Sequence, residues 1–325
     1  MQITFAEAEF VSKKKQTRRD RLLMDLETLV PWSVLESVIE PYYPKSDGKR
    51  GRPTMGLSRM LRMYILQQVM GFSDEGTEDA VYDSAAIQLF MDIDLGRDAV
   101  PDATTLLRFR RLLETHSLTQ QIFAAVNYQL ASKGLYLKEG TVVDATIIAA
   151  PPSTKNKSKS RDPQMRSTKK GNQYYFGMKA HIGADAASGL VHTLVTTAAN
   201  VHDVNQAHAL LHGEEQQVYG DSGYLGADKR EENKDKDVEW VVAMRHGKRR
   251  KLRDSGTEEG QLADKIEKLK SRIRAKVEHP FYWVKVHFGH RKTRYRGLAK
   301  NTAHLYSLFA LANLFLSKRC MPLAG

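Results

Sequence analysis

Residues 140–150 read GTVVDATIIAA, and this stretch decides the expected fold. Its β-branched residues favour a strand, and a nearly continuous apolar run is typical of a central strand buried on both faces. Asp144 interrupts the run, and a buried carboxylate is costly unless it is paired or coordinates a metal ion. Asp144 is therefore a candidate metal ligand, with a satisfied structural carboxylate at a strand end as the alternative.

The sequence after this stretch alternates between strand and helix patterns. The order is three strands, a helix, a strand, a helix, a strand and a helix. This order predicts an α/β fold with a mixed five-stranded sheet flanked by helices. The turn DAASG at 185–189 is expected to join the second and third strands. Residues 153–172, STKNKSKSRDPQMRSTKKGN, are interpreted as a basic loop. The expected strands cover residues 141–150, 174–185, 190–200, 217–221 and 238–245, and the expected helices cover residues 204–213, 227–235 and 261–288.

The chain before this region has helical spacing. Several short helices at these spacings predict an all-α, helix-turn-helix-like N-terminal domain, and a helical dimerisation or packing domain is the alternative. The expected organisation is a DNA-binding or dimerisation region at 1–135, a catalytic core at 136–300 and a C-terminal helix with its tail at 301–325. The expected N-terminal helices cover residues 18–30, 31–40, 54–71, 73–91 and 103–130, with Thr54, Ser73 and Asp102 at their starts and Gly71 at an end.

Charge is the unusual feature of the composition. The chain has 325 residues and a net charge of +12, which favours a polyanionic partner or an anionic membrane surface. Its longest apolar stretch, residues 304–316, is too short to span a bilayer. A single cysteine, Cys320, excludes an internal disulfide. We therefore expect a cytoplasmic protein, not a membrane protein, in which oxygen ligands hold any metal.

A second carboxylate stands at the end of a predicted strand. Asp221 follows QVYG and precedes Gly223, so a tight turn is expected to leave it at the carboxyl end of that strand. Open sheets bind their ligands at this edge. The alternative is an ordinary helix N-cap or Asx-turn.

The third carboxylate lies on the predicted basic helix. Arg274, Glu278, Phe281 and Lys285 fall within a narrow sector of a 3.6-residue helix, which suits a surface that meets both a metal site and a phosphate backbone. A salt-bridged solvated face is the alternative. Pro280 is expected to kink the helix just after Glu278.

Five segments, taken in order, resemble bacterial insertion-sequence DDE transposases, in particular the group typified by insertion sequence five within the broader insertion-sequence-four-like superfamily. The resemblance implies a ribonuclease-H-like core, a helical N-terminal DNA-binding region, and a metal-binding triad of Asp144, Asp221 and Glu278. The segments are VVDATII (142–148), TKKGNQYYFGMKAHIG (168–183), TTAANVHDVNQ (196–206), GDSGYLGA (220–227) and RAKVEHPFYWVKVHFG (274–289).

The related insertion-sequence-four group has a Tyr, Arg, Glu, Lys pattern on its catalytic helix. Arg274, Glu278 and Lys285 match the last three members, whereas Ser271 stands at the tyrosine position and takes over no role. Arg274 suits bidentate binding of a phosphate, and Lys285 suits a mobile point charge.

The resemblance and the residues together predict a transposase. It is expected to bind the terminal inverted repeats of its element as a homodimer, cleave double-stranded DNA at the element ends, and join the 3′ ends to target DNA. Two Mg²⁺ ions, for which Mn²⁺ can substitute, are expected in a site where they lie about 3.5–4 Å apart. A structure-selective nuclease and a DNA-binding regulator with an inactive core are the alternatives. A bacterial cytoplasmic location is expected, at the nucleoid when DNA is bound.

Basic residues supply the expected DNA path, with solvated mobile loops as the alternative. His202, Asp203 and His279 lack the spacing of a zinc site and are expected to orient the active-site loops. The predicted DNA-binding residues are Lys169, Lys170, Arg249, Arg250, Arg274, Lys285, Arg291, Lys292, Arg294 and Arg296, together with Arg108, Arg110 and Arg111 of the N-terminal region.

Overall fold

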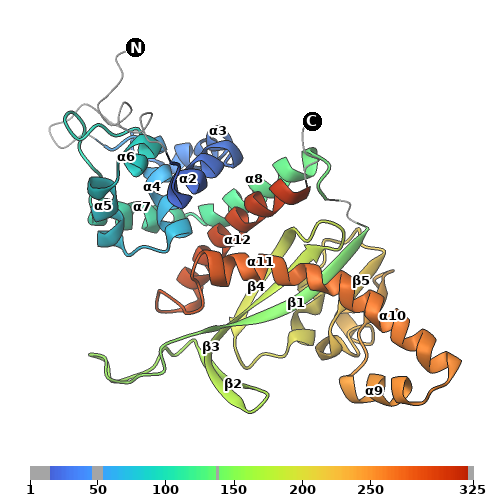
Figure 1. The fold of residues 1–325 in the computed structure, drawn as a ribbon. Helices are drawn as coiled ribbons and strands as arrows, with labels where there is room; N and C mark the ends of the chain where they lie inside the picture. Colours follow the sequence, from blue (N-terminus) through green and yellow to red (C-terminus); the bar gives the residue numbers. More distant parts are fainter. Residues whose placement is uncertain (1–14, 46–53, 137–138, 321–325) are drawn as a thin grey trace. The chain divides into compact units, whose positions relative to one another are not determined.

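A mixed six-stranded β-sheet is the centre of the part of the chain that follows residue 139 (Figure 1). The computed structural model describes residues 15–45, 54–136 and 139–320. The strands are β1 (Gly140–Ala149), β2 (Arg166–Lys170), β3 (Gln173–Asp185), β4 (Val191–Ala198), β5 (Gln217–Gly220) and β6 (Glu239–Val242). β1 pairs antiparallel with β3 and parallel with β5, and β6 pairs parallel with β5. The first residues of β3 pair with β2 and the later ones with β4.

The prediction of five strands was wrong by one, because β2 lies within the segment interpreted as a basic loop. β2 pairs with β3 through a tight hairpin, in which Lys170 faces Gln173 and Gly171 has a φ of 60°. The two-residue turn needs this conformation, which glycine adopts freely. β2 is an exposed edge strand rich in lysine, which discourages pairing with other chains. Its sequence has no apolar alternation, so its partner β3 makes it a strand.

β1 and β3 approach each other closely at Gly177, which pairs with Ala149. A Cβ atom built on Gly177 would overlap the carbonyl oxygen of Ile148 and would lie 2.9 Å from the backbone nitrogen of Ala150. Both obstacles are backbone atoms, which cannot rotate away. The glycine therefore allows β1 to keep its full length of pairing.

We predict that Gly177→Ala lowers the free energy of unfolding by about 1–3 kcal/mol, because the added methyl group forces the two backbones apart. The shift of the urea midpoint measures this effect. Gly247→Ala is the matched control, since a Cβ there has nothing within 4 Å. Equal midpoints for the two variants would contradict the close approach.

One face of the sheet buries an apolar cluster around Val143. Ala207 and Leu210 of η2 (Asp203–Leu210) pack there with Val218 and Tyr224. The helices predicted at 204–213 and 227–235 form 3₁₀ turns instead, η2 and η4 (Glu231–Asn233). Such short segments gain little from helix propagation, so their packing on the sheet sets their conformation.

Helices cover the opposite face, where residues 275–277 pack against β1 between α10 and α11 (Figure 1). The single helix predicted at 261–288 is divided into several helical segments, and Pro280 explains part of this division. With no backbone N–H to donate, Pro280 lies in the first turn of a new helix, where that donor is not needed. The segments are α10 (Glu258–Arg274), the 3₁₀ turn η5 (Ala275–Val277), α11 (Glu278–Tyr282) and the π-helical turn η6 (Trp283–His287). The short helix α9 (His246–Asp254), which was not predicted, precedes them.

The N-terminal region is helical, as predicted, although two of the expected helices are divided. Ser73 and Asp102 accept hydrogen bonds as N-caps, and Gly71 ends a helix with a φ of 70°. Thr54 is not a cap, because the N-cap is Gly56. The breaks fall at Ser84 and Ser117. The helices are α2 (Arg18–Leu29), α3 (Trp32–Ile39), followed by the turn η1 (Glu40–Tyr42), α4 (Leu57–Met70), α5 (Asp74–Asp83), α6 (Ala85–Met91), α7 (Ala103–Thr115) and α8 (Leu118–Ser132).

The chain forms two compact units, each of which takes residues from distant parts of the sequence. Residues 1–126 and 306–314 form the first unit, and residues 127–305 and 315–325 form the second. Within the first unit, the Tyr64 hydroxyl lies 2.8 Å from the Ser307 hydroxyl, and Leu308 and Phe309 are buried. The first unit is therefore incomplete without residues 306–314.

These late residues belong to α12 (Leu298–Cys320), which contains the apolar stretch at 304–316. In the described parts of the chain, no helix combines the length and the hydropathy that a membrane span requires.

Candidate active site

The candidate site lies where β1 and β5 part. The parallel pairing between them ends at Val142 and Tyr219. Asp144 comes two residues after the last paired position of β1, and Asp221 follows the end of β5 directly. Because the strands run in the same direction, both carboxylates lie at the same opening of the sheet.

The surroundings of Asp144 shift the pKa of its carboxyl in both directions. Burial raises the pKa of its carboxyl to about 6, and the charges of Asp221 and Asp203 raise it as well. A hydrogen bond of 2.7 Å from the backbone N–H of Ala145 and the charge of Arg274 act in the opposite direction. The structure therefore brings Asp144, Asp221 and Arg274 close enough to interact, and it adds Asp203.

Asp221 has the capping role that the sequence offered as the alternative. Its carboxylate accepts a hydrogen bond of 2.7 Å from the backbone N–H of Gly223 and caps the 3₁₀ turn η3 (Ser222–Tyr224). The cap fixes the carboxylate at the end of β5, so the structural role does not exclude a metal-binding one.

Asp203 was not among the predicted site residues. It accepts a hydrogen bond of 2.8 Å from Lys179 of β3. Its carboxylate also lies 3.7 Å from Nδ1 of the buried His181, whose Nε2 lies 2.8 Å from the Thr197 hydroxyl. The sequence pattern ANVHD marked Asp203 as a loop residue, but no spacing indicated that Lys179 would reach it.

Two buried polar groups face these carboxylates without a hydrogen-bond partner among the described residues. They are the hydroxyl of Tyr224 and Nε of Arg274. Burial raises the pKa of Tyr224, and the charges of Asp203, Asp144 and Asp221 raise it further. Tyr224 was missed because a tyrosine in the turn GDSGY gives no sign of where its hydroxyl points.

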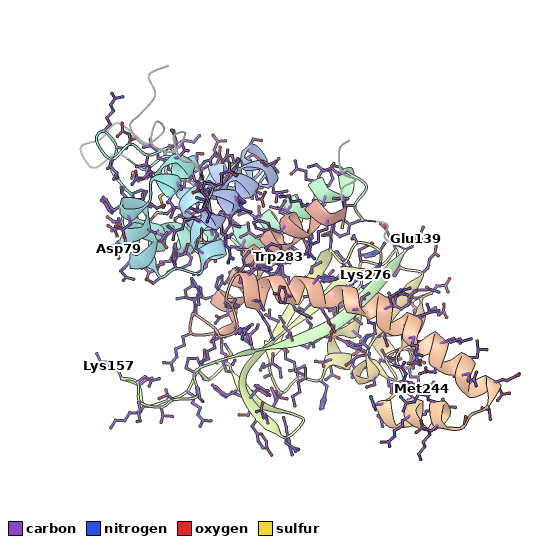
Figure 2. The ribbon with its side chains drawn as sticks, viewed as in Figure 1. Asp79, Glu139, Lys157, Met244, Lys276 and Trp283 are labelled. Carbon is purple, nitrogen blue, oxygen red and sulfur yellow. The ribbon has the colours of Figure 1, made fainter. Side chains whose placement is uncertain are left out.

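Glu278 lies on a segment that is fixed to the sheet, although its own side chain is exposed. Lys276, labelled in Figure 2, donates hydrogen bonds of 2.8 and 2.9 Å to the carbonyls of Ala186 and Ala187 in the turn between β3 and β4. Val277 is buried, and η5 packs against β1. In the described structure the Glu278 side chain has no hydrogen bond or ion pair, and the three predicted triad carboxylates are not as compact as a preformed metal cluster.

Lys285 lies on the same face of β1 as Asp144. Its ammonium group donates a hydrogen bond of 2.6 Å to the Thr146 hydroxyl, two residues along the strand. Burial lowers its pKa, and the nearby charges of Lys170 and Arg291 lower it further. Three of the predicted DNA-binding cations therefore gather beside the opening.

The segment 291–296 extends this basic surface. Its backbone pairs with the end of β1, where the N–H of Thr293 donates to the carbonyl of Ala149 over 2.8 Å. Arg296 donates to the hydroxyls of Ser158 and Ser160, which anchors the basic segment whose Lys157 is labelled in Figure 2. Lys292 and Arg294 are exposed on the same stretch, and Lys169 is exposed on β2.

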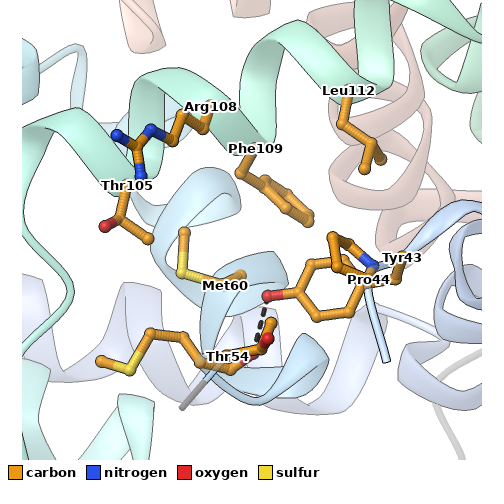
Figure 3. Close-up of a pocket in the computed structure, with 9 residues that line it drawn as sticks. Tyr43, Pro44, Thr54, Met60, Thr105, Arg108, Phe109 and Leu112 are labelled. Atoms are coloured by element: carbon orange, nitrogen blue, oxygen red, sulfur yellow. Dashed lines mark hydrogen bonds between the residues drawn. The ribbon is translucent and has the colours of Figure 1, made fainter. Parts of the chain in front are cut away.

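The remaining predicted cations have different surroundings. Arg249 pairs with the well-buried Asp264 over 3.0 Å, which joins α9 to α10. Arg250 is exposed and lies 3.6 Å from Asp254. Arg108 of α7 is exposed and lines a pocket of about 290 Å³ (Figure 3).

Arg110 of the same helix is buried and is therefore unavailable to DNA in this conformation. It donates two hydrogen bonds to Asp74, of 2.6 and 2.8 Å. This bidentate geometry favours a structural role. Arg111 is exposed.

We predict that Arg110→Ala lowers the free energy of unfolding by about 2–4 kcal/mol, because Asp74 loses its charged partner inside the helical unit. Thermal denaturation of the full chain measures the change. The neighbouring Arg111→Ala is the control and is expected to change stability by less than about 0.5 kcal/mol. If the Arg110→Ala protein were as stable as the wild type, the structural role would be excluded and Arg110 would again be a candidate DNA contact.

A strand-borne pair of carboxylates at a sheet opening, with cations beside it, defines a candidate site for metal-dependent chemistry on a polyanion. A transposase DDE domain model matches residues 136–314, more than half of the chain, and a further transposase domain model, DUF772, matches residues 10–112. No solved structure matches the chain. The chain belongs to the DDE transposase family and is thus a metal-dependent DNA transposase, a polynucleotidyl transferase.

This family implies a divalent metal, and the residues at the opening fit one. Asp144, Asp221 and Asp203 offer carboxylate oxygens, the ligands that hard cations prefer. Their mutual repulsion raises the pKa of Asp144, so a cation would relieve it. The buried hydroxyl of Tyr224, which has no hydrogen-bond partner among the described residues, is a further oxygen beside these carboxylates.

Proposed function

We propose that this transposase binds the terminal inverted repeats of an insertion sequence, cleaves DNA at the element ends and joins the 3′ ends to target DNA. We place it in the group typified by insertion sequence five, with a ribonuclease-H-like core. The observation that carries the proposal is the meeting of Asp144, Asp221 and Arg274 where β1 and β5 part. Metal-dependent phosphodiester cleavage uses such a concentration of metal-binding oxygens.

We assign Asp144, Asp221 and Glu278 as the residues that hold two Mg²⁺ ions, for which Mn²⁺ can substitute. When bound, the ions supply Lewis-acid stabilisation of the phosphodiester and activation of its attacker. Glu278 would complete the set by turning its exposed side chain toward the opening, which its anchored position on η5 and α11 permits.

Arg274 and Lys285 would orient the DNA for two successive reactions. In the first, water attacks the phosphodiester at the element end and a 3′ hydroxyl leaves. In the second, this hydroxyl attacks a phosphodiester of the target, and the 3′ oxygen of the broken target strand leaves. The guanidinium of Arg274 suits a non-bridging phosphate oxygen at the opening, while Lys285 holds the strand over Thr146.

The basic surface beside the opening would carry the DNA backbone. The exposed cations of β2 and the segment 291–296 lie there, and those of α9 and α7 would extend contacts toward the repeat. We propose that residues 1–135 recognise the terminal repeat in a helix-turn-helix-like manner and that two copies pair the two ends on the nucleoid. The proposed backbone contacts are Lys169, Lys170, Arg250, Arg291, Lys292, Arg294 and Arg296, with Arg249 available on release of Asp264 and Arg108 and Arg111 in the N-terminal region.

We predict that Asp144→Asn, Asp221→Asn and Glu278→Gln each reduce Mg²⁺-dependent cleavage of a repeat-containing duplex by at least about 10³-fold, because each removes a metal-binding charge. Affinity for the duplex is expected to change less than about threefold, since backbone contacts lie elsewhere. Gel assays of cleavage and of binding separate the two effects.

The exposed Asp235→Asn is the control for loss of a carboxylate and is expected to cleave normally. If Glu278→Gln also cleaved normally, Glu278 would leave the proposed triad. If all three variants kept their activity, the proposed reaction centre would be wrong.

We also predict that Lys170→Ala and Arg291→Ala weaken DNA binding and reduce the slope of log affinity against log salt by about one each, because each removes a phosphate contact. Titrations at several salt concentrations measure the slope. Lys234→Ala, which removes an exposed lysine paired with Glu231, is the control. Unchanged slopes for the first two variants would exclude this surface as the DNA path.

A further inference from the structure

A second cluster of metal-binding side chains lies in the sheet unit, away from the carboxylate opening. His192 comes from β4, and His212 and Glu215 come from the connection between η2 and β5. Ligand atoms of the three side chains all lie within 4.8 Å of one another. Among the histidine, cysteine and carboxylate side chains of the described residues, no other group of three lies as close together. Thr141, at the start of β1, lies between them.

This cluster is separate from the proposed catalytic centre. Thr141 and Asp144 are three positions apart on β1, so their side chains point to opposite faces of the sheet. The cluster also lies near the start of β1, before the strand parts from β5. A metal bound there would not share ligands with Asp144 or Asp221.

The spacing of the ligand atoms suits tetrahedral coordination. Nε2 of His192 lies 3.0 Å from the Thr141 hydroxyl, and that hydroxyl lies 3.2 Å from Oε1 of Glu215. The same Oε1 lies 3.5 Å from Nε2 of His212. Ligands about 2.0–2.1 Å from a tetrahedral Zn²⁺ are separated by roughly 3.4 Å, which is close to the separation of the Glu215 and His212 atoms. All three ligand atoms lie within 4.8 Å of one another, so the third has to move closer to surround an ion.

The protonation states also favour metal binding. Burial and, to a lesser extent, the nearby His212 lower the pKa of His192 to about 4, so its imidazole is uncharged at neutral pH. Burial acts to raise the pKa of Glu215, but backbone N–H groups, including those of His212 and Gly213, outweigh it and lower the pKa. His192 and Glu215 are thus in the forms that bind a cation.

Backbone groups hold these ligands in place. The N–H groups of His212 and Gly213 donate to the two Glu215 oxygens over 2.6 and 2.7 Å. The N–H of Glu214 donates to Nδ1 of His212 over 3.1 Å, so an ion at Nε2 would have to displace the ring proton from Nε2 and open this contact. The two contacts to Glu215 fix the orientation of its carboxylate, as outer hydrogen bonds do for the ligands of metal sites.

We propose that His192, His212 and Glu215 bind one Zn²⁺ ion that ties β4 to the connection before β5. Two imidazoles and one carboxylate prefer Zn²⁺ over Mg²⁺, which prefers a site made of oxygen ligands. The ion therefore differs from the catalytic metal in identity and in role, because it holds together the frame that carries Asp221. The side chain of His212 is 21% exposed, so the ion can reach the site from solvent.

The test uses the full-length protein, stripped of metal and titrated with Co²⁺, whose visible absorption reports a four-coordinate nitrogen and oxygen site. We expect one equivalent to give this absorption, and excess Zn²⁺ to abolish it. We also expect Zn²⁺ at 100 times its dissociation constant to raise the melting temperature by roughly 5 °C.

Two variants and one control make the outcome decisive. His212→Asn and Glu215→Gln should lose the absorption and the Zn²⁺-dependent rise in melting temperature. The double variant Asp144→Asn/Asp221→Asn should keep both, because the catalytic carboxylates are not involved. If wild type gives no such absorption, or if folded His212→Asn protein keeps it, the cluster is only a hydrogen-bonded network and the proposal is overturned.

Discussion

The rest of the catalytic unit depends on one constraint, the placing of negative charge inside a sheet. Asp144 is half-buried, and desolvation, together with the charges of Asp221 and Asp203, raises its pKa to about 6. A protein gains nothing in stability from such a group, because desolvation and like charges both oppose its ionisation. The surrounding cations, Arg274 near the carboxylates and Lys285 on Thr146, partly offset this cost. Groups with such unfavourable electrostatics are common at functional sites, so the loss of stability at Asp144 is explained by a functional role.

The architecture of the sheet explains how the charges can be tolerated there. β5 is four residues long, and its pairing with β1 ends at Val142. Beyond that point β1 has no paired strand on the β5 side, so its side chains there lie beside an opening in the sheet. Asp221 is then fixed by its own cap on Gly223. On the other face, Val143 and the apolar cluster around it provide the packing that the charged face does not. The same strand therefore supports stability on one side and chemistry on the other.

The sequence was most informative where local pattern and tertiary environment agree. The β-branched run around Asp144 predicted β1, and Ser73, Asp102 and Gly71 predicted helix ends, because these features act through neighbouring residues. β2 was missed because its lysines form a strand only through β3. The partner of Arg110 lies 36 positions away on another helix, and Tyr224 reaches the carboxylates only through the fold. Long-range polar contacts of this kind leave no periodic signal.

The division of the chain has a consequence for how the protein is made. The backbone passes between the two units after residues 126, 305 and 314, so the helical unit includes a segment from near the C-terminus. A nascent chain has to extend beyond residue 309 before Leu308 and Phe309 can enter the core of the first unit. Contacts between such distant positions make folding slow, and the apolar surface that the helices expose until then favours aggregation. The helical unit therefore becomes stable only after most of the sheet unit has been synthesised.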